Sequence, residues 1–361
     1  MRNLWWRLQD RLVVVRHELE HFAFDRKVAL HGAAAVRIGT GLAVLGMLLS
    51  NFSSRQLLAG PASVWADPAR AASSFPEIAL LRDVSPDVVT VVYVATTLAA
   101  LAFVVGWHTR LANVLTLVGF IAVVGQNPVV AGQGDNLIRL TLLWLLLVQT
   151  AGFWSLDARR RGRSARRRRP WDPEEVVPLW LSTSLHNLGL LGLGLQTVLM
   201  YMSAGLDKVS HEAWQHGNAL YYTLQLPEYR PFPWLADLLS GSEVLLAIVT
   251  YAVLFVQLFF GPLLLNRHTR ALVVALAIIV NVVFAVVLAV PWSSLAVIAA
   301  TCLFVSTRAF EMLDARLRDV LGAVGDWLAE RGYDLADRLD ALRYRVFFPV
   351  VDWVRDRLPS R

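Results

Sequence analysis

Eight separate stretches of the chain are apolar over a length that approaches or reaches the thickness of a lipid bilayer. A helix needs about 20 mostly apolar residues to span the hydrocarbon core. The stretches lie near residues 29–51, 88–107, 111–127, 138–154, 184–204, 243–265, 271–290 and 292–306. The third and the eighth are short, and a re-entrant segment is the alternative for the eighth. Backbone N–H and C=O groups find no water in the hydrocarbon core, so a chain that does not close into a β-barrel crosses it as α-helices. We therefore predict an all-α, polytopic transmembrane bundle of about eight spans.

The composition excludes a soluble globular enzyme and a disordered chain. Apolar residues make up 56% of the 361 residues, charged residues make up 17%, and the mean hydropathy is +0.50. Soluble domains contain about 25% charged residues. The single cysteine, Cys302, also excludes an intramolecular disulfide and a CxxC metal or redox motif.

The placement of arginine predicts the orientation in the membrane. Of 34 basic residues only Lys27 and Lys208 are lysines, and residues 159–169 hold eight arginines. The positive-inside rule places that loop in the cytoplasm. From this loop, the chain changes sides of the membrane at each of the eight spans, which places both termini in the cytoplasm. The cytoplasmic segments then contain 27 basic residues and the outer loops contain five. We therefore expect a multi-pass protein of the cell membrane, and membrane topology explains the arginines without a nucleic-acid partner.

Both ends of the chain have the pattern of a basic amphipathic helix. Apolar residues recur at helical spacing within residues 1–28 and again within residues 307–361. Such helices beside a membrane domain lie in the plane of the anionic cytoplasmic leaflet. We therefore expect a basic interfacial helix over 1–28, a transmembrane domain over 29–306 and a basic cytoplasmic tail over 307–361. Packing of the two ends on each other or on a protein partner is the alternative.

Polar residues gather at two regions that this orientation places on the outer side. The first runs from Gln126 to Arg139 and contains Asp135 four residues before Arg139, which puts both on one helix face. Polar groups at membrane depth are costly, so each needs a structural or functional reason. The structural reason here is a carboxylate that caps the fourth span and neutralises Arg139.

The second polar region runs from residue 201 to residue 229 and contains one of the two lysines. A lysine at the end of a span can lose its proton when it is desolvated, and it can then act as a base. The alternative is that Lys208 extends to the outer interface and pairs with Asp207 or Glu212. His211 and His216 have no cysteine or third histidine nearby, so we expect no metal site. Trp214, Tyr221 and Tyr222 are typical of interfacial anchors.

Four separated motifs resemble one membrane-protein family. They are A-G-L-D-K-V with Q-H-G-N-A-L-Y-Y (204–209 and 215–222), G-Q-G-D-N-L-I-R-L with F-W-S-L-D-A-R-R (132–140 and 153–160), N-F-S-S-R-Q-L-L-A-G-P (51–61) and G-W-H-T-R-L (106–111). In this order they resemble the HTTM family, the membrane domain shared with vitamin K-dependent γ-glutamyl carboxylase. The likeness covers about residues 29–306 and is typical of a bacterial member.

The resemblance implies roles for particular residues. Lys208 matches the carboxylase lysine that deprotonates reduced vitamin K, so a quinone or quinol is the implied cofactor. The resemblance also implies a proton relay, for which the candidates are His211, His216 and Tyr221. The residues that it implies for binding the cofactor are Gly205, Asp207, Trp214, Gly217, Tyr221, Asp135, Asn136, Arg139 and Asn281. Two positions depart from the family pattern, because Asp135 and Asn281 stand where carboxylases or other members carry histidine.

Two functions follow from the resemblance. Some bacterial members resemble membrane factors that help to mature or export a secreted peptide, and the replaced histidines favour this accessory role. The alternative is a quinol-dependent membrane enzyme, similar to a carboxylase or epoxidase, with Lys208 as base. A small-molecule transporter is less favoured, because the sequence lacks paired halves of similar hydropathy.

Overall fold

A computed structural model describes residues 20, 24–73, 79–81, 84–164 and 178–342 of the chain. Within these ranges all regular structure is helical and no β-strand occurs, which confirms the predicted all-α class. The chain forms two units, residues 1–305 and residues 306–361. The predicted helix at residues 1–28 and the arginines beyond Ser164 lie largely outside the described residues.

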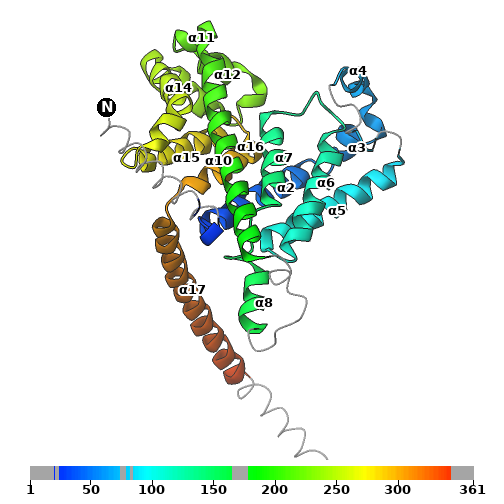
Figure 1. Ribbon diagram of the computed structural model, residues 1–361, viewed down its shortest axis with the longest axis vertical. Coiled ribbons are helices and arrows are strands. Elements are labelled where there is room, and N and C mark those ends of the chain that lie inside the picture. Colours follow the sequence, from blue (N-terminus) through cyan, green and yellow to red (C-terminus); the bar gives the residue numbers. More distant parts are fainter. Residues whose placement is uncertain (1–19, 21–23, 74–78, 82–83, 165–177, 343–361) are drawn as a thin grey trace, which may run out of the picture. The chain divides into compact units, whose positions relative to one another are not determined.

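The first unit contains nine longer helices among the described residues (Figure 1). They are α2 (Leu30–Ser50), α5 (Pro86–Val105), α6 (Thr109–Val124), α7 (Gln133–Leu145), α8 (Leu156–Ser164), α10 (Leu179–Val209), α14 (Glu243–Leu265), α15 (Arg270–Val287) and α16 (Pro291–Thr301). Shorter helical segments join them: α3 (Arg55–Ala59), η2 (Pro61–Ala66), α4 (Asp67–Ala71), α11 (Glu212–Gln215), α12 (Ala219–Gln225), η4 (Pro227–Tyr229), α13 (Pro233–Ser240) and η5 (Cys302–Phe304). The described part of the second unit is one helix, α17 (Thr307–Leu342).

Local signals in the sequence set several of these helix ends. Ser85 caps α5 by accepting a hydrogen bond from the Val88 amide at 3.5 Å, and Pro86 occupies the first turn, where its missing N–H leaves no acceptor unsatisfied. Gly106 ends α5 at φ 69°, a left-handed conformation that glycine adopts readily. Pro291 begins α16 in the same way.

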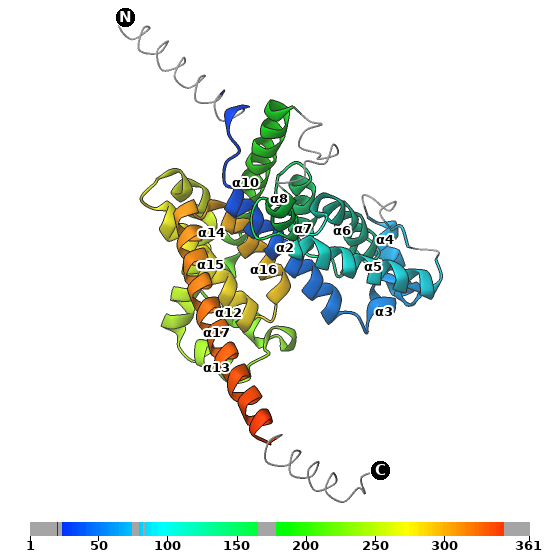
Figure 2. The ribbon, with the colours of Figure 1, turned by 90° about the horizontal axis from the view of Figure 1, so that it is seen from below.

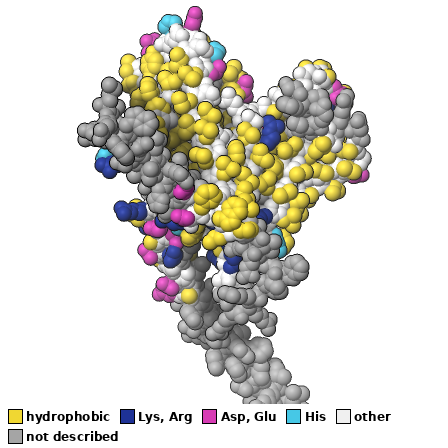
Figure 3. Space-filling model, in the orientation of Figure 1, with side chains coloured by type: hydrophobic (Ala, Val, Ile, Leu, Met, Phe, Trp, Pro, Cys, Tyr) yellow, Lys and Arg dark blue, Asp and Glu magenta, His cyan; other side chains and the backbone are white. Residues whose placement is uncertain are grey.

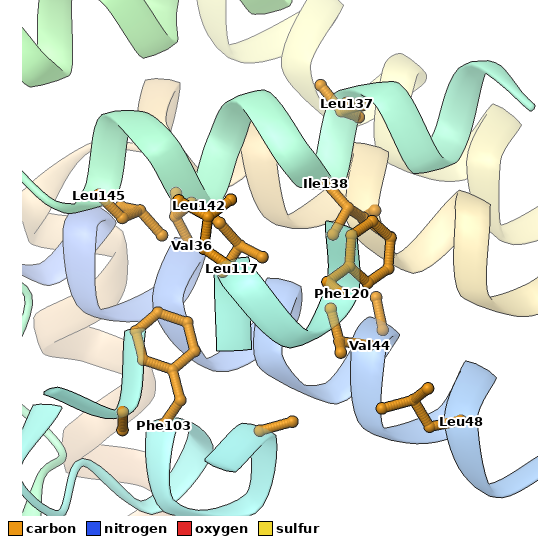
Figure 4. Close-up of a cluster of buried hydrophobic side chains, with 14 of the residues drawn as sticks. Val36, Val44, Leu48, Phe103, Leu117, Phe120, Leu137, Ile138, Leu142 and Leu145 are labelled. Carbon is orange, nitrogen blue, oxygen red and sulfur yellow. The ribbon is translucent and has the colours of Figure 1, made fainter. Parts of the chain in front are cut away.

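Helix α2 lies at the centre of the first unit. In its most apolar window 61% of residues are buried inside the protein, whereas the values for α5, α10, α14 and α15 are 22–39%. Figures 1 and 2 show α2 beside α5 and α16, and the main core draws its side chains from these helices and from α6, α7 and α10. Figure 4 shows Ile138 and Leu142 of α7 pointing toward Val36 and Val44 of α2.

The outward faces of the peripheral helices are apolar. Figure 3 shows hydrophobic side chains over most of the visible middle of the first unit, with acidic and histidine side chains at the end formed by α11 and α12. Val91 and Leu98 on α5 and Ile248 on α14 are each at least 60% exposed. Faces of this kind are stable in lipid, where no water contacts them.

In the described part of the chain, five helices are long and apolar enough to cross a membrane: α2, α5, α10, α14 and α15. A sixth candidate begins at Pro291, and α6 is apolar but has 16 residues. Each of the eight predicted stretches overlaps a helix, but the count of eight spans stays a prediction. The fourth differs most, because α7 begins at Gln133 and ends at Leu145 instead of covering 138–154.

A buried arginine ties α2 to the ends of two other segments. Arg37 is 0% exposed and its guanidinium donates hydrogen bonds to the carbonyl oxygens of Val104 (2.9 Å) and Trp154 (2.7 Å). A third bond, at 2.8 Å, reaches the carbonyl of Phe103. The last carbonyls of a helix have no partner within it, so Arg37 satisfies the end of α5. Its hydrogen-bond partners are therefore backbone carbonyl oxygens.

Candidate functional site

Lys208 lies in the last turn of α10, where it contacts an aromatic ring. Its Nζ atom lies 5.2 Å from the centre of the Trp214 ring and 3.4 Å from the carbonyl oxygen of Ala204. The side chain is half-buried, and among the described residues no carboxylate pairs with it. A cation over a ring face at this distance is favourable, so Trp214 stabilises the ammonium, and the charge of the neighbouring Asp207 stabilises it as well.

The side chains predicted to assist Lys208 do not converge on it. His211 is exposed, and its Nδ1 atom lies 2.8 Å from the carbonyl oxygen of Asp207 at the end of α10. His216, Asp207 and Tyr221 are also exposed. His211 therefore satisfies a helix C-terminus, and nothing in this arrangement forms a relay to the lysine.

Both glycines of the lysine motif are needed where helices approach closely. A methyl group on Gly205 would lie 2.8 Å from the backbone nitrogen of Leu258 on α14. Gly217 has φ 73°, and the ring of Tyr251 packs against it while the Tyr251 hydroxyl donates to the Gln215 carbonyl at 2.8 Å. These positions fix α10 and the following segment against α14, and this packing accounts for both glycines.

A cavity of about 410 Å³ lies at the other polar region, where α2 and α6 end and α5, α7 and α16 begin. We call it the Asn127 cavity. It is lined by Met47, Leu48, Asn51, Leu58, Tyr93, Val123, Val124, Asn127, Val130, Asp135, Ile138 and residues 289–293. All these helix ends lie on the side that the arginine distribution predicts to be outside. Its volume lies within the range of about 300–1,000 Å³ that is usual for ligand pockets.

Asn127 gives this cavity a buried donor that lacks a partner. The side chain is 1% exposed, and its Oδ1 atom accepts a hydrogen bond from the Val129 amide at 3.2 Å. Its Nδ2 atom is buried and has no hydrogen-bond partner among the described residues. An unsatisfied buried donor costs about 1–3 kcal/mol. The unsatisfied amide lies beside the cavity, and Asn127 is a candidate contact for a ligand with an acceptor oxygen.

Asp135 lines this cavity and also a second one. The second cavity, of about 310 Å³, is lined in addition by Asn136 and Arg139. The Asp135 Oδ2 atom accepts a hydrogen bond from the Gly132 amide at 2.8 Å. This is the bond expected of a carboxylate that caps the start of the fourth predicted span. Arg139 instead donates to the Oδ1 atom of Asn136 at 2.8 Å. Asp135, Asn136 and Arg139 therefore lie in one region, and the Asp135 side chain lines both cavities.

Asn281 lies in a different place, in the core between α10, α15 and α16. Its Nδ2 atom donates to the Tyr201 hydroxyl at 3.0 Å and to the Ala277 carbonyl at 2.8 Å. The Tyr201 hydroxyl in turn lies 3.0 Å from the Thr301 hydroxyl. This buried network joins three helices, and such networks fix the way helices pack in membranes.

The structure thus separates the predicted site residues into three groups. Gln196 of α10 contacts the beginning of α7 through the Leu137 carbonyl at 3.3 Å. Lys208 follows twelve residues later, about 18 Å further along the helix at 1.5 Å per residue. Lys208 lines neither of the two cavities around Asp135. Sequence reasoning missed Asn127, Tyr93 and Trp292 as site residues, although the pair Asn127-Pro128 at the end of a span was a usable signal.

A helical chain with five or more long apolar helices, a polar cavity among the helix ends and arginine-rich connections is a polytopic membrane protein. A profile of the HTTM domain matches residues 26–308. The chain therefore belongs to the HTTM family, as the motifs of the sequence indicate. Comparison with curated proteins and with solved structures finds no significant match.

Proposed function

We propose that this protein is a membrane accessory factor that binds a secreted peptide during its maturation or export. The observation that supports the proposal is the unpaired amide donor of Asn127 in the Asn127 cavity. A peptide backbone offers carbonyl acceptors for this donor and N–H donors for the nearby carboxylate of Asp135. The apolar wall, which includes Leu48, Val123 and Ile138, suits the side chains of a hydrophobic peptide.

The positions of the polar groups favour binding over catalysis. A base must lie within about 3 Å of the proton that it removes, or reach it through one water molecule. Lys208 does not line the Asn127 cavity, whose own polar and aromatic groups are an amide, a carboxylate and aromatic side chains. In this proposal the protein resides in the cell membrane with both termini in the cytoplasm, and the Asn127 cavity opens toward the outer side, where a secreted peptide emerges.

Site-specific photo-cross-linking in the producing cells tests this function. Val130 lines the cavity and Val118 lies on the apolar outer face of α6, and each is 53% exposed. With benzoylphenylalanine at Val130, we expect a covalent adduct that contains a secreted peptide. The same residue at Val118 should give lipid adducts only. Equal peptide adducts at both positions, or none at Val130, would contradict the proposal.

The second candidate function is a quinol-dependent enzyme with Lys208 as base. The half-buried ammonium over Trp214, with no carboxylate partner in the described residues, supports it. Quinol-dependent oxygen uptake by the purified protein would be the expected activity. The variant K208R keeps the charge over the ring but cannot act as a base, so it should abolish that activity. Absence of uptake in the wild type would remove this candidate.

A further inference from the structure

A third cavity, of about 420 Å³, lies at the opposite ends of α6 and α7, beside α8. We call it the Arg110 cavity. It is lined by residues 108–111, Asn113, Leu145, residues 148–151, Asp157, Arg160 and Arg161. The arginine distribution of the sequence predicts this side to be cytoplasmic. Three arginines and a single carboxylate face one cavity, so the lining is positive.

The one carboxylate is already engaged by the protein. Asp157 accepts hydrogen bonds from the amide of His108 at 3.1 Å, from the amide of Thr109 at 2.9 Å and from the hydroxyl of Thr109 at 2.7 Å. Burial would raise the pKa of Asp157, but these hydrogen bonds outweigh it and lower the pKa from 3.8. Asp157 thus caps the first turn of α6 and does not pair with an arginine of the cavity.

Two of the arginines are unengaged. In the described part of the chain, no hydrogen bond or ion pair involves the side chain of Arg110 or Arg160, and both are exposed. Arg161 is different, because it donates to the Ala151 carbonyl at 2.6 Å. Guanidinium groups bind phosphate through paired N–H donors, and these donors are available on Arg110 and Arg160.

The cavity also holds a buried acceptor and an apolar wall. Asn113 is 2% exposed, and its Oδ1 atom has no partner among the described residues. Leu111, Leu145 and Val148 supply the apolar wall. A hydroxyl group on a ligand would satisfy the amide oxygen, and an acyl chain would contact the wall. A phospholipid whose headgroup carries a phosphate and hydroxyl groups has all three features.

We propose that the Arg110 cavity binds the phosphate group of an anionic ligand, with Arg110 and Arg160 as its cationic contacts. The ligand is a phospholipid headgroup or a free phosphate ion. This site is separate from the Asn127 cavity, so it does not depend on the proposed accessory function.

Calorimetric titration of the purified full-length protein in detergent tests the site. The probes are dioctanoyl phosphatidylglycerol, dioctanoyl phosphatidylcholine and inorganic phosphate. The double variant R110Q/R160Q removes the two contacts, and R159Q/R267Q removes two charges from exposed arginines that do not line the cavity. Arg110, Arg159 and Arg160 have no side-chain contact in the described residues, and Arg267 has one exposed hydrogen bond, to the adjacent His268 (3.1 Å), so we expect both double variants to unfold at the wild-type temperature.

We expect the wild type and R159Q/R267Q to bind phosphatidylglycerol with the same affinity, and R110Q/R160Q to bind it about tenfold more weakly or worse. Phosphatidylglycerol binding that inorganic phosphate does not displace identifies a lipid as the ligand. Displacement by phosphate, with the same dependence on the two arginines, identifies the free ion. Equal affinity for phosphatidylglycerol in R110Q/R160Q and the wild type would overturn the proposal. Absence of binding of both phosphatidylglycerol and inorganic phosphate to the wild type would overturn it as well.

Discussion

Replacement of Gly205 by alanine separates a packing role from a cofactor role at this position. The added methyl would lie 2.8 Å from the backbone nitrogen of Leu258 and 2.9 Å from its Cα atom. Carbon atoms in favourable contact are about 3.5–4.0 Å apart, so α10 and α14 must move apart. Overpacking of this kind costs about 1–3 kcal/mol. Alanine recovers about 1 kcal/mol in helix propensity, so the net destabilisation should be about 0–2 kcal/mol.

Gly194 on the same helix provides the matched control. A methyl there meets its nearest atom, of the Leu303 side chain, at 3.7 Å, which is ordinary contact. G194A should therefore stabilise the protein by up to about 1 kcal/mol, and the two variants should have effects of opposite sign. Equilibrium unfolding in mixed micelles, followed by circular dichroism, measures both free energies. If G205A gains as much stability as G194A, Gly205 has no packing role; loss of a bound ligand with that gain in stability would instead support the cofactor role.

Three further predictions concern folding and topology. Arg37→Met should lower the free energy of unfolding by about 3 kcal/mol or more, because buried carbonyl oxygens of α5 lose their charged donor; the same unfolding assay measures it. Since the folded-state pKa of Asp157 lies below 3.8, its contribution to stability should be complete above that pH and lost as the pH falls further. Stability measured against pH should show this loss in the wild type but not in D157N. In a Cys302→Ser background, an impermeant maleimide should label Val64→Cys in intact cells and Gly162→Cys only after permeabilisation, and the reverse pattern would invert the topology.

The sequence predicts the class of fold well because lipid imposes a length and a polarity on every span. All eight apolar stretches overlap helices, and α14 has the predicted ends, Glu243 and Leu265. The start of α7 was not predictable from hydropathy. Asp135 accepts a hydrogen bond from the Gly132 amide, so the helix begins among polar residues that an apolar window excludes.

The candidate site was only partly predictable. The resemblance placed Lys208 and Asp135 in one site, whereas α10 continues to Val209, five residues beyond the predicted span, and carries the lysine away from α7. The unpaired amide of Asn127 depends on how five helix ends meet, and no spacing in the sequence reports it. The polar run from Gln126 to Arg139 nevertheless contains Asn127 and Asp135, which both line the Asn127 cavity.

The most direct test of the account is mass spectrometry of the ligand that co-purifies with wild type, N127L and K208Q from producing cells. Leucine has nearly the size of asparagine but no donor, and it also removes the acceptor of the bond from the Val129 amide, so the stability of N127L is measured beside its ligand content. The account predicts a secreted peptide on the wild type and on K208Q, and its loss from N127L. Retention by N127L together with loss from K208Q would show that Lys208, and not the Asn127 cavity, holds the ligand.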